Sequence, residues 1–175
     1  MYSIRFRSQH GYTLVELMVT LAVVVILLLV AVPNFTDLLR KNRLSSASNN
    51  LIAAVSLARS EAIKTNNPAI ICASANGTTC SGDATGWGRG WIVWADADND
   101  GVPDANEVVR SQGDLGGLSL ASATASRITV NARGQVTAVA SFAMQPTSCK
   151  PGVGNRREFS VLLSGMVRAE HKNCL

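Results

Sequence analysis

Carboxylate side chains recur at a regular spacing between residues 96 and 107. The segment follows the pattern D-x-D-x-D-G-x5-E, which is the spacing of a calcium-binding loop. Calcium prefers roughly six to eight oxygen ligands, and Gly101 would permit the sharp turn that lets them converge. The ligands that this pattern predicts are the carboxylates of Asp96, Asp98, Asp100, Asp104 and Glu107 and the backbone carbonyl of Val102.

The residues on either side of this segment are typical of strands, whereas the calcium loops with this spacing lie between helices. Turns between strands are themselves rich in Asp, Asn and Gly. The sequence therefore favours a solvated turn, with calcium as the alternative. We expect no other cofactor.

A further carboxylate, Glu16, lies at the start of a long apolar run. Residues 17–32 contain Thr20 as their only polar residue, and with the flank from Tyr12 the stretch is long enough to cross a bilayer as a helix. Two basic residues, Arg5 and Arg7, precede it, which predicts a cytoplasmic N-terminus and an exported C-terminal part. A carboxylate in such a run is costly unless it finds a partner, and this indicates a function for Glu16.

The N-terminal residues carry a family resemblance. The heptapeptide Gly11–Leu17, GYTLVEL, followed by the apolar run, resembles the prepilin leader of type IV pilins and type II secretion pseudopilins. The resemblance implies that a membrane-embedded prepilin peptidase cuts between Gly11 and Tyr12 and that Tyr12 becomes N-methylated. It also implies that Glu16 pairs with the N-terminal amine of a neighbouring subunit and sets the register of assembly. The usual first mature residue is Phe, and Tyr12 keeps the aromatic ring.

Four segments later in the chain resemble the FimT/FimU and H-type pseudopilin group. They are ARSEA at 58–62, GWIVW at 90–94, NARG at 131–134 and SGMVR at 164–168. The resemblance implies a minor pilin of a type IV pilus in the complex that primes assembly at the tip. The alternative is a minor pseudopilin of a type II secretion system. The implied partners are other pilins or pseudopilins, the prepilin peptidase and the bacterial inner membrane, where the exported part lies in the periplasm before assembly.

All four cysteines lie in the part of the chain that we expect to be exported, and an even number in an oxidising compartment favours disulfides. Three pairings are possible. Proximity in sequence favours Cys72–Cys80, and the C-terminal bridge typical of the resembled family favours Cys149–Cys174. The sequence has no CxxC pattern, which disfavours a metal–thiolate site.

Some FimT-like proteins bind DNA through a C-terminal G-R-x-R element, and Gly165–Arg168 is the matching stretch here with Met166 in place of the first Arg. A DNA-binding receptor at the pilus tip, acting through Arg156, Arg157 and Arg168, is the alternative from another functional class. A solvated basic face is favoured over it. We expect that the protein is not an enzyme, because the sequence contains no catalytic motif and no general base that could activate a Ser or Cys nucleophile.

These groups must be positioned by one long helix and a β-rich domain. Apolar residues at steps of three and four continue the helix beyond Pro33, so that it spans about residues 13–64 with a kink or a loosened turn at the proline. Strands are predicted at 69–73, 91–95, 107–111, 127–131, 135–142, 158–163 and 166–169. The fold class is therefore α+β and pilin-like, with the helix packed on antiparallel sheets.

The expected organisation has four parts. Residues 1–11 form the cleaved leader, 12–32 the transmembrane and filament-core helix, 33–66 the amphipathic half of that helix, and 67–175 the periplasmic domain. The composition of the 175 residues, which are 47% hydrophobic with a net charge of +4, excludes intrinsic disorder. Removal of the leader takes away Arg5 and Arg7, so any DNA binding depends on the local C-terminal cluster.

Overall fold

A single long helix opens the fold. The computed structural model of the chain describes residues 11–174, without the side chains at positions 30, 33, 34 and 37. Helix α1 (Leu14–Thr65) begins where the Thr13 hydroxyl accepts a hydrogen bond from the Glu16 N–H at 3.2 Å, which caps the first turn. It ends at Thr65, and the next residue, Asn66, has a φ of 55°, which is typical of the residue that follows a helix C-terminus. The helix runs through Pro33, as a single element.

The chain divides into two compact units, residues 1–39 and 40–175. In the first unit, the described part of α1 exposes nearly all of its apolar side chains, including Leu17 and Leu29. Among the described residues, no helix combines the length and apolar character needed to cross a membrane. Most of the predicted leader, residues 1–10, lies outside the described residues.

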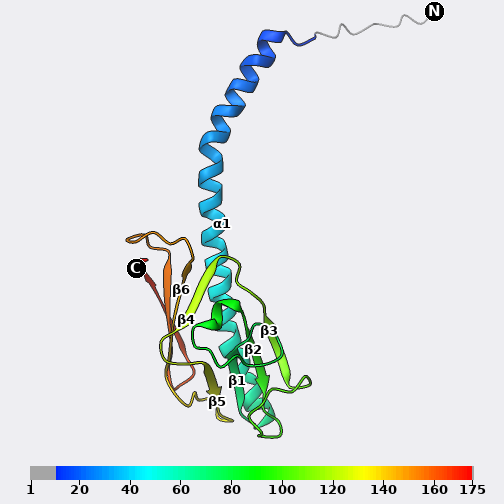
Figure 1. Ribbon diagram of the computed structural model, residues 1–175, viewed down its shortest axis with the longest axis vertical. Coiled ribbons are helices and arrows are strands. Elements are labelled where there is room, and N and C mark those ends of the chain that lie inside the picture. Colours follow the sequence, from blue (N-terminus) through cyan, green and yellow to red (C-terminus); the bar gives the residue numbers. More distant parts are fainter. Residues whose placement is uncertain (1–10, 175) are drawn as a thin grey trace, which may run out of the picture. The chain divides into compact units, whose positions relative to one another are not determined.

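The second unit contains two antiparallel sheets (Figure 1). The first sheet has the order β3-β2-β1-β5. Its strands are β1 (Ala69–Ala73), β2 (Trp91–Ala95), β3 (Val108–Gln112) and β5 (Arg127–Val130). Strands β1 and β2 pair in register from Ala69 opposite Ala95 to Ala73 opposite Trp91, and a short 3-10 helix, η1 (Gly86–Arg89), precedes β2.

The second sheet has the order β4-β6-β7-β8. Its strands are β4 (Leu118–Ser122), β6 (Ala140–Pro146), β7 (Arg156–Val161) and β8 (Val167–Lys172). Strand β4 was missing from the sequence prediction, because LSLAS alternates leucine with small residues and lacks the β-branched and aromatic side chains that mark strands. Strand β6 begins at residue 140 and not at 135, since residues 131–135 form a turn closed by the Asn131 side chain.

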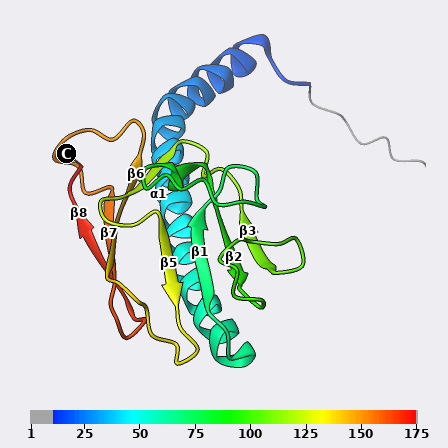
Figure 2. The ribbon, with the colours of Figure 1, turned by 60° about the horizontal axis from the view of Figure 1, so that its bottom comes forward.

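The core lies between α1 and the two sheets, and Figure 2 shows the helix behind β1 and β5. The predicted apolar stripe of the helix is buried throughout, at Leu44, Ala47, Leu51, Val55, Ala58 and Ala62. It joins one cluster with Ile71 and Val93 of the first sheet and Phe159 of the second. Trp87 of η1 completes this core, where its ring meets Phe142 edge-on at 4.9 Å and its Nε1 donates to the Ala125 carbonyl.

Candidate functional site

The candidate processing and assembly residues lie at the start of α1. Tyr12 is 87% exposed, and Glu16 is exposed in the first turn of the helix. Within the described chain, no hydrogen bond or ion pair engages the Glu16 carboxylate. Its neighbours Leu14, Val15 and Leu17 are exposed as well. The structure thus presents a carboxylate without an internal partner on an apolar helix surface, and such a group gains most from a cation supplied by another molecule.

The acidic segment forms the connection between β2 and β3, so strands and not helices flank it, as the sequence indicates. Glu107 is buried and organises the loop: its Oε1 accepts the Ala97 N–H at 2.7 Å and its Oε2 accepts the Asp104 N–H at 3.3 Å. Asp96 is also buried and accepts the Gly101 N–H at 3.5 Å. These backbone hydrogen bonds give Glu107 a structural role, because its carboxylate holds the two sides of the loop together.

Carboxylate oxygens of Asp96, Asp98 and Glu107 lie within 4.8 Å of one another, which is close enough to ligate one cation. The structure therefore brings together three of the five predicted carboxylates. The other two, Asp100 and Asp104, do not belong to this cluster, and Asp100 instead accepts the N–H of Val102 at 2.7 Å.

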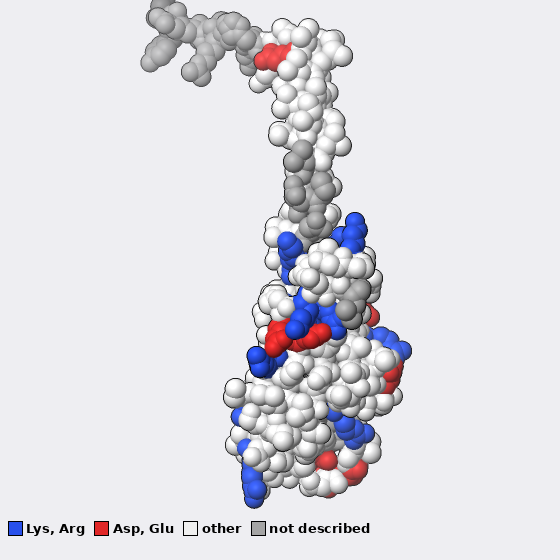
Figure 3. Space-filling view, turned by 90° about the vertical axis from the view of Figure 1, so that its left-hand side faces the viewer, with Lys and Arg blue, Asp and Glu red and all other residues white. Residues whose placement is uncertain are grey.

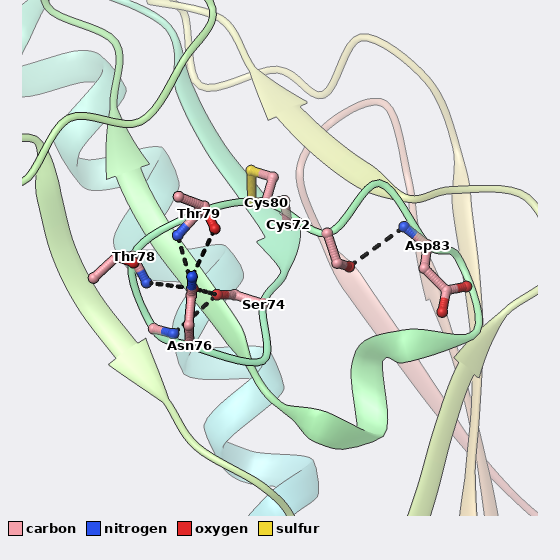
Figure 4. The surroundings of a disulfide bond; sticks show 9 residues. Cys72, Ser74, Asn76, Thr78, Thr79, Cys80 and Asp83 are labelled. Carbon is pink, nitrogen blue, oxygen red and sulfur yellow. Dashed lines mark hydrogen bonds between the residues drawn. A yellow bond between two sulfur atoms is a disulfide. The ribbon is translucent and has the colours of Figure 1, made fainter.

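Two disulfides tie loop segments in the folded unit, one to strand β1 and one to the segment after β8, and they join the pairs that the sequence favours. Cys72 is joined to Cys80, and Cys149 is joined to Cys174. Figure 4 shows the first bridge beside a loop centred on Asn76, whose Oδ1 accepts the N–H groups of Thr78 and Thr79. The bridge and these hydrogen bonds hold the loop after β1 in one conformation.

The three arginines proposed for DNA binding do not form one cluster. Strand pairing places Arg156 opposite Lys172, and Arg168 opposite Ser160 four residues further along β7. At about 3.3 Å per residue, Arg156 and Arg168 are therefore more than 10 Å apart along the strand. Because side chains alternate between the two faces of a strand, Arg157 lies on the opposite face from Arg156.

Acidic residues on the same face of β7 and β8 neutralise much of this basic charge (Figure 3). Arg156 pairs with Glu158 at 2.7 Å, and Glu170 pairs with both Arg168 and Lys172 at 3.3 and 3.2 Å. The hydrogen bond and charge of Lys172, with the charge of Arg168, hold the pKa of Glu170 below its ordinary value. The cations are thus engaged with carboxylates before any nucleic acid approaches.

Arg59 of α1 connects two of the family-like segments, and its role was missed in the sequence analysis. Its Nε donates to the Gly134 carbonyl at 3.0 Å and its Nη1 contacts the Gly165 carbonyl at 3.5 Å. The end of the helix is thereby fastened to the turn after β5 and to the hairpin between β7 and β8. The available signal was an arginine directly beside the buried stripe, between Ala58 and Ala62.

Comparisons with known proteins agree with this architecture. The model of the family described as type II transport protein GspH matches residues 47–166, and that of the prokaryotic N-terminal methylation motif matches residues 6–32. No protein in the curated set matches the chain.

Two kinds of solved structure are similar to this chain. One is the type IV minor pilin FimU of Pseudomonas aeruginosa, with 23% identity, a TM-score of 0.54, and coverage of 74% of this chain and 89% of FimU. The other is the minor pseudopilin EpsH from the type 2 secretion system of Vibrio cholerae, with 14% identity, a TM-score of 0.52, and coverage of 73% of this chain and 95% of EpsH. These similarities confirm the pilin-like α+β fold, with a long helix packed on antiparallel sheets.

Proposed function

Because the chain belongs to the family of the type II transport protein GspH, we propose that it is a minor pilin inserted into a type IV pilus, in the complex that primes assembly at the tip. The family and the fold make it a structural minor pilin or pseudopilin of a type IV pilus or a type II secretion system, and not an enzyme. The observation that carries the minor pilin or pseudopilin class is the methylation motif at residues 6–32, joined in one chain to a GspH-type domain. The choice of the type IV pilus rests on the resemblance of the later segments to the FimT/FimU group.

In the proposed assembly pathway, the subunit is first inserted in the inner membrane. Residues 1–11 act as the leader, a prepilin peptidase cuts between Gly11 and Tyr12, and the new N-terminus is methylated. Residues 12–32 span the inner membrane with the N-terminus in the cytoplasm, while 33–66 and 67–175 lie in the periplasm. The match of the methylation motif supports this order of events, and so does the exposure of the apolar side chains along this part of α1.

Glu16 sets the register with which the subunit enters the filament. In an apolar filament core its carboxylate is paired with the amine of Tyr12 on a neighbouring subunit, because each charge alone would be costly there. The unengaged carboxylate at the start of α1 supports this role. The arrangement transfers no atoms, and its outcome is a subunit held at one axial position.

Replacement of Glu16 tests this function directly. Glu16→Ala leaves the chain in the membrane and abolishes its recovery in sheared filaments. Glu61→Ala is the matched control, since Glu61 lies near the other end of the same helix and its carboxylate pairs with Lys64 at 3.2 Å. Recovery of the Glu16 variant in filaments at the level of the control would refute the register role.

The type II secretion pseudopilin is the alternative within the same family. Complementation separates the two: the gene restores pili to a strain lacking FimU-type subunits under the proposal, and secretion to a strain lacking H-type pseudopilins under the alternative. If the gene restores secretion but not pili, the type IV pilus proposal is wrong and the chain is a type II secretion pseudopilin.

DNA capture at the tip and calcium binding stay predictions from the sequence. For DNA, the ion pairs of Arg156 with Glu158 and of Arg168 with Glu170 disfavour binding of phosphates. Salt-dependent DNA binding, lost when Arg156, Arg157 and Arg168 are all replaced by Ala, would reverse that preference. For calcium, the convergence of Asp96, Asp98 and Glu107 supports a site, and calorimetry of the full chain in detergent tests it. If calcium produces neither heat of binding nor a shift in melting temperature, the calcium-site hypothesis is excluded.

A further inference from the structure

A basic hollow lies at the start of the folded unit, away from the residues discussed above. It has a volume of about 140 Å³. Arg40 and Arg43 of α1 form one wall, and residues of two loops and the adjoining strand ends form the other: Gly116, Gly117, Leu118, Pro146, Thr147 and Ser148. A volume of this size accommodates a carboxylate group.

The hollow is held in shape by contacts between its two loops. The N–H of Thr147 donates to the Gly117 carbonyl at 3.0 Å, and the Thr147 hydroxyl donates to the same oxygen at 3.2 Å. The adjoining Leu118 and Pro146 are paired across β4 and β6 and are buried. Leu118 and Pro146 line the hollow with apolar atoms, and Arg40 and Arg43 are exposed beside them.

The charge around the hollow is mainly positive. Lys41 lies between the two arginines in sequence, and Lys150 follows Ser148 in the same loop; both are exposed. We call Arg40, Lys41, Arg43 and Lys150 the basic collar. The nearest acidic residue in the loops that form the hollow is Asp114, whose Oδ1 already accepts the N–H of Gly116 at 2.7 Å.

The opposite end of the same unit carries the complementary charge. The acidic loop, residues 96–104, follows the end of β2 and is joined to the end of the helix by the hydrogen bond from the Asp96 N–H to the Pro68 carbonyl. Its exposed carboxylates belong to Asp98, Asp100 and Asp104. None of the ion pairs in the described part of the chain engages them.

The two charged ends are separated by most of the length of the folded unit. About 25 helical residues lie between Arg40 and Thr65, which corresponds to roughly 37 Å at 1.5 Å per residue. A basic end and an acidic end on one elongated unit suit a head-to-tail contact, in which one end of each subunit meets the other end of the next. Such a contact extends into a filament and does not close into a dimer.

We propose that the hollow binds a carboxylate side chain of the acidic loop, residues 96–104, of a second copy of this chain. This inference rests on the proposed function, because it describes a contact inside the filament. Charge complementarity carries it: the basic collar and the acidic loop are both exposed, lie at opposite ends of the same unit and have opposite sign. The contact would orient the folded unit, while Glu16 positions the helix.

Photo-crosslinking in intact filaments tests the proposal. A benzophenone amino acid replaces Lys41, which is exposed and follows Arg40 in sequence but does not line the hollow, and mass spectrometry identifies the linked peptide. We expect a peptide that contains residues 96–107 of a second copy of this chain. Linkage to phospholipid, to a different subunit, or to a peptide of this chain outside residues 96–107 would overturn the proposal.

Charge reversal of the arginines that line the hollow provides a second test of the proposed contact. The pair Arg40→Glu and Arg43→Glu lowers the amount of the chain in filaments by about tenfold or more, since tenfold is the lower end of the losses seen when close charge pairs are removed from an interface. The control pair Arg110→Glu and Arg127→Glu, also exposed on the same unit, leaves the amount unchanged. Equal incorporation of the collar variant and the control variant contradicts the inference.

The outcomes separate the inference from the function on which it rests. Absence of the wild-type chain from filaments refutes the proposed function itself. Presence of the wild type, absence of Glu16→Ala and normal incorporation of the collar variant refute the collar contact alone. If the collar variant fails to fold, as shown by its tryptophan fluorescence, Arg43→Gln replaces it and is compared with Arg43→Lys, which keeps the charge and is expected to incorporate normally.

Discussion

Gly165, in the hairpin between β7 and β8, is the position where we expect an alanine substitution to destabilise the folded unit most clearly. This residue is buried with φ +75°, and a Cβ added there would lie 2.6 Å from the Arg59 side chain and 2.8 Å from the Gly134 carbonyl oxygen. Gly152 is the matched control, because its φ is +81° and an added Cβ would meet no atom within 4 Å. Both Gly→Ala variants carry the left-handed strain, and only Gly165→Ala also carries the clash.

The magnitudes follow from these two contributions. Left-handed backbone costs a non-glycine residue about 1–2 kcal/mol, and forcing extra atoms into a packed site costs about 1–3 kcal/mol more. Gly152→Ala is therefore expected to lose about 1–2 kcal/mol and Gly165→Ala about 2–5 kcal/mol. At roughly 3 °C per kcal/mol for a unit of this size, the melting temperature falls by about 3–6 °C and about 6–15 °C.

The assay is thermal unfolding of the full chain in detergent, followed by tryptophan fluorescence. Trp87, Trp91 and Trp94 are all buried in the folded unit, so the signal reports that unit and not the exposed part of α1. Adding Arg59→Ala to Gly165→Ala recovers part of the loss, because the nearest clashing side chain is removed. Equal losses of stability for the two glycine variants, or the same loss for Gly165→Ala with and without Arg59→Ala, would refute the close packing of Arg59 against Gly165.

Three further predictions concern the folded unit. Replacing Cys149 and Cys174 by Ser frees a loop of 25 residues, which is expected to cost about 3.5 kcal/mol in chemical denaturation; an unchanged midpoint would contradict it. Trp87→Phe loses the hydrogen bond to Ala125 and leaves a void, and we expect a loss of about 2 kcal/mol in the same measurement. The hydrogen bonds from Thr85 lower the pKa of Asp83, so Asp83→Asn reduces the melting temperature slightly at pH 7. That difference vanishes as the pH falls below the pKa, and a difference that persists at pH 2 would exclude this cause.

The sequence predicted the elements whose residue patterns are strong. The helix end before Pro68 and the strands β1 and β2 were placed correctly, because caps, prolines and runs of β-branched and aromatic residues are local signals. Strand β4 was missed because its small residues carry no such signal. It forms through pairing with β6, which is a tertiary contact.

The candidate sites divide in the same way. The leader, Glu16 and the acidic spacing are linear motifs, and they could be predicted from the residues alone. The clamp of Arg59 on Gly134 and Gly165 joins residues 75 and 106 positions apart, so no local pattern reveals it. The basic hollow also depends on the fold, since Arg43 meets residues 116–118 and 146–148 only when α1 packs on the second sheet.

The central claim, a minor pilin processed at Gly11, is tested most directly by the mass of the N-terminal peptide of the chain recovered from purified filaments. The account predicts that the chain is present in the filaments and that its first residue is an N-methylated Tyr12. A chain that starts at Met1, or that stays in the membrane fraction while filaments assemble normally, would contradict it.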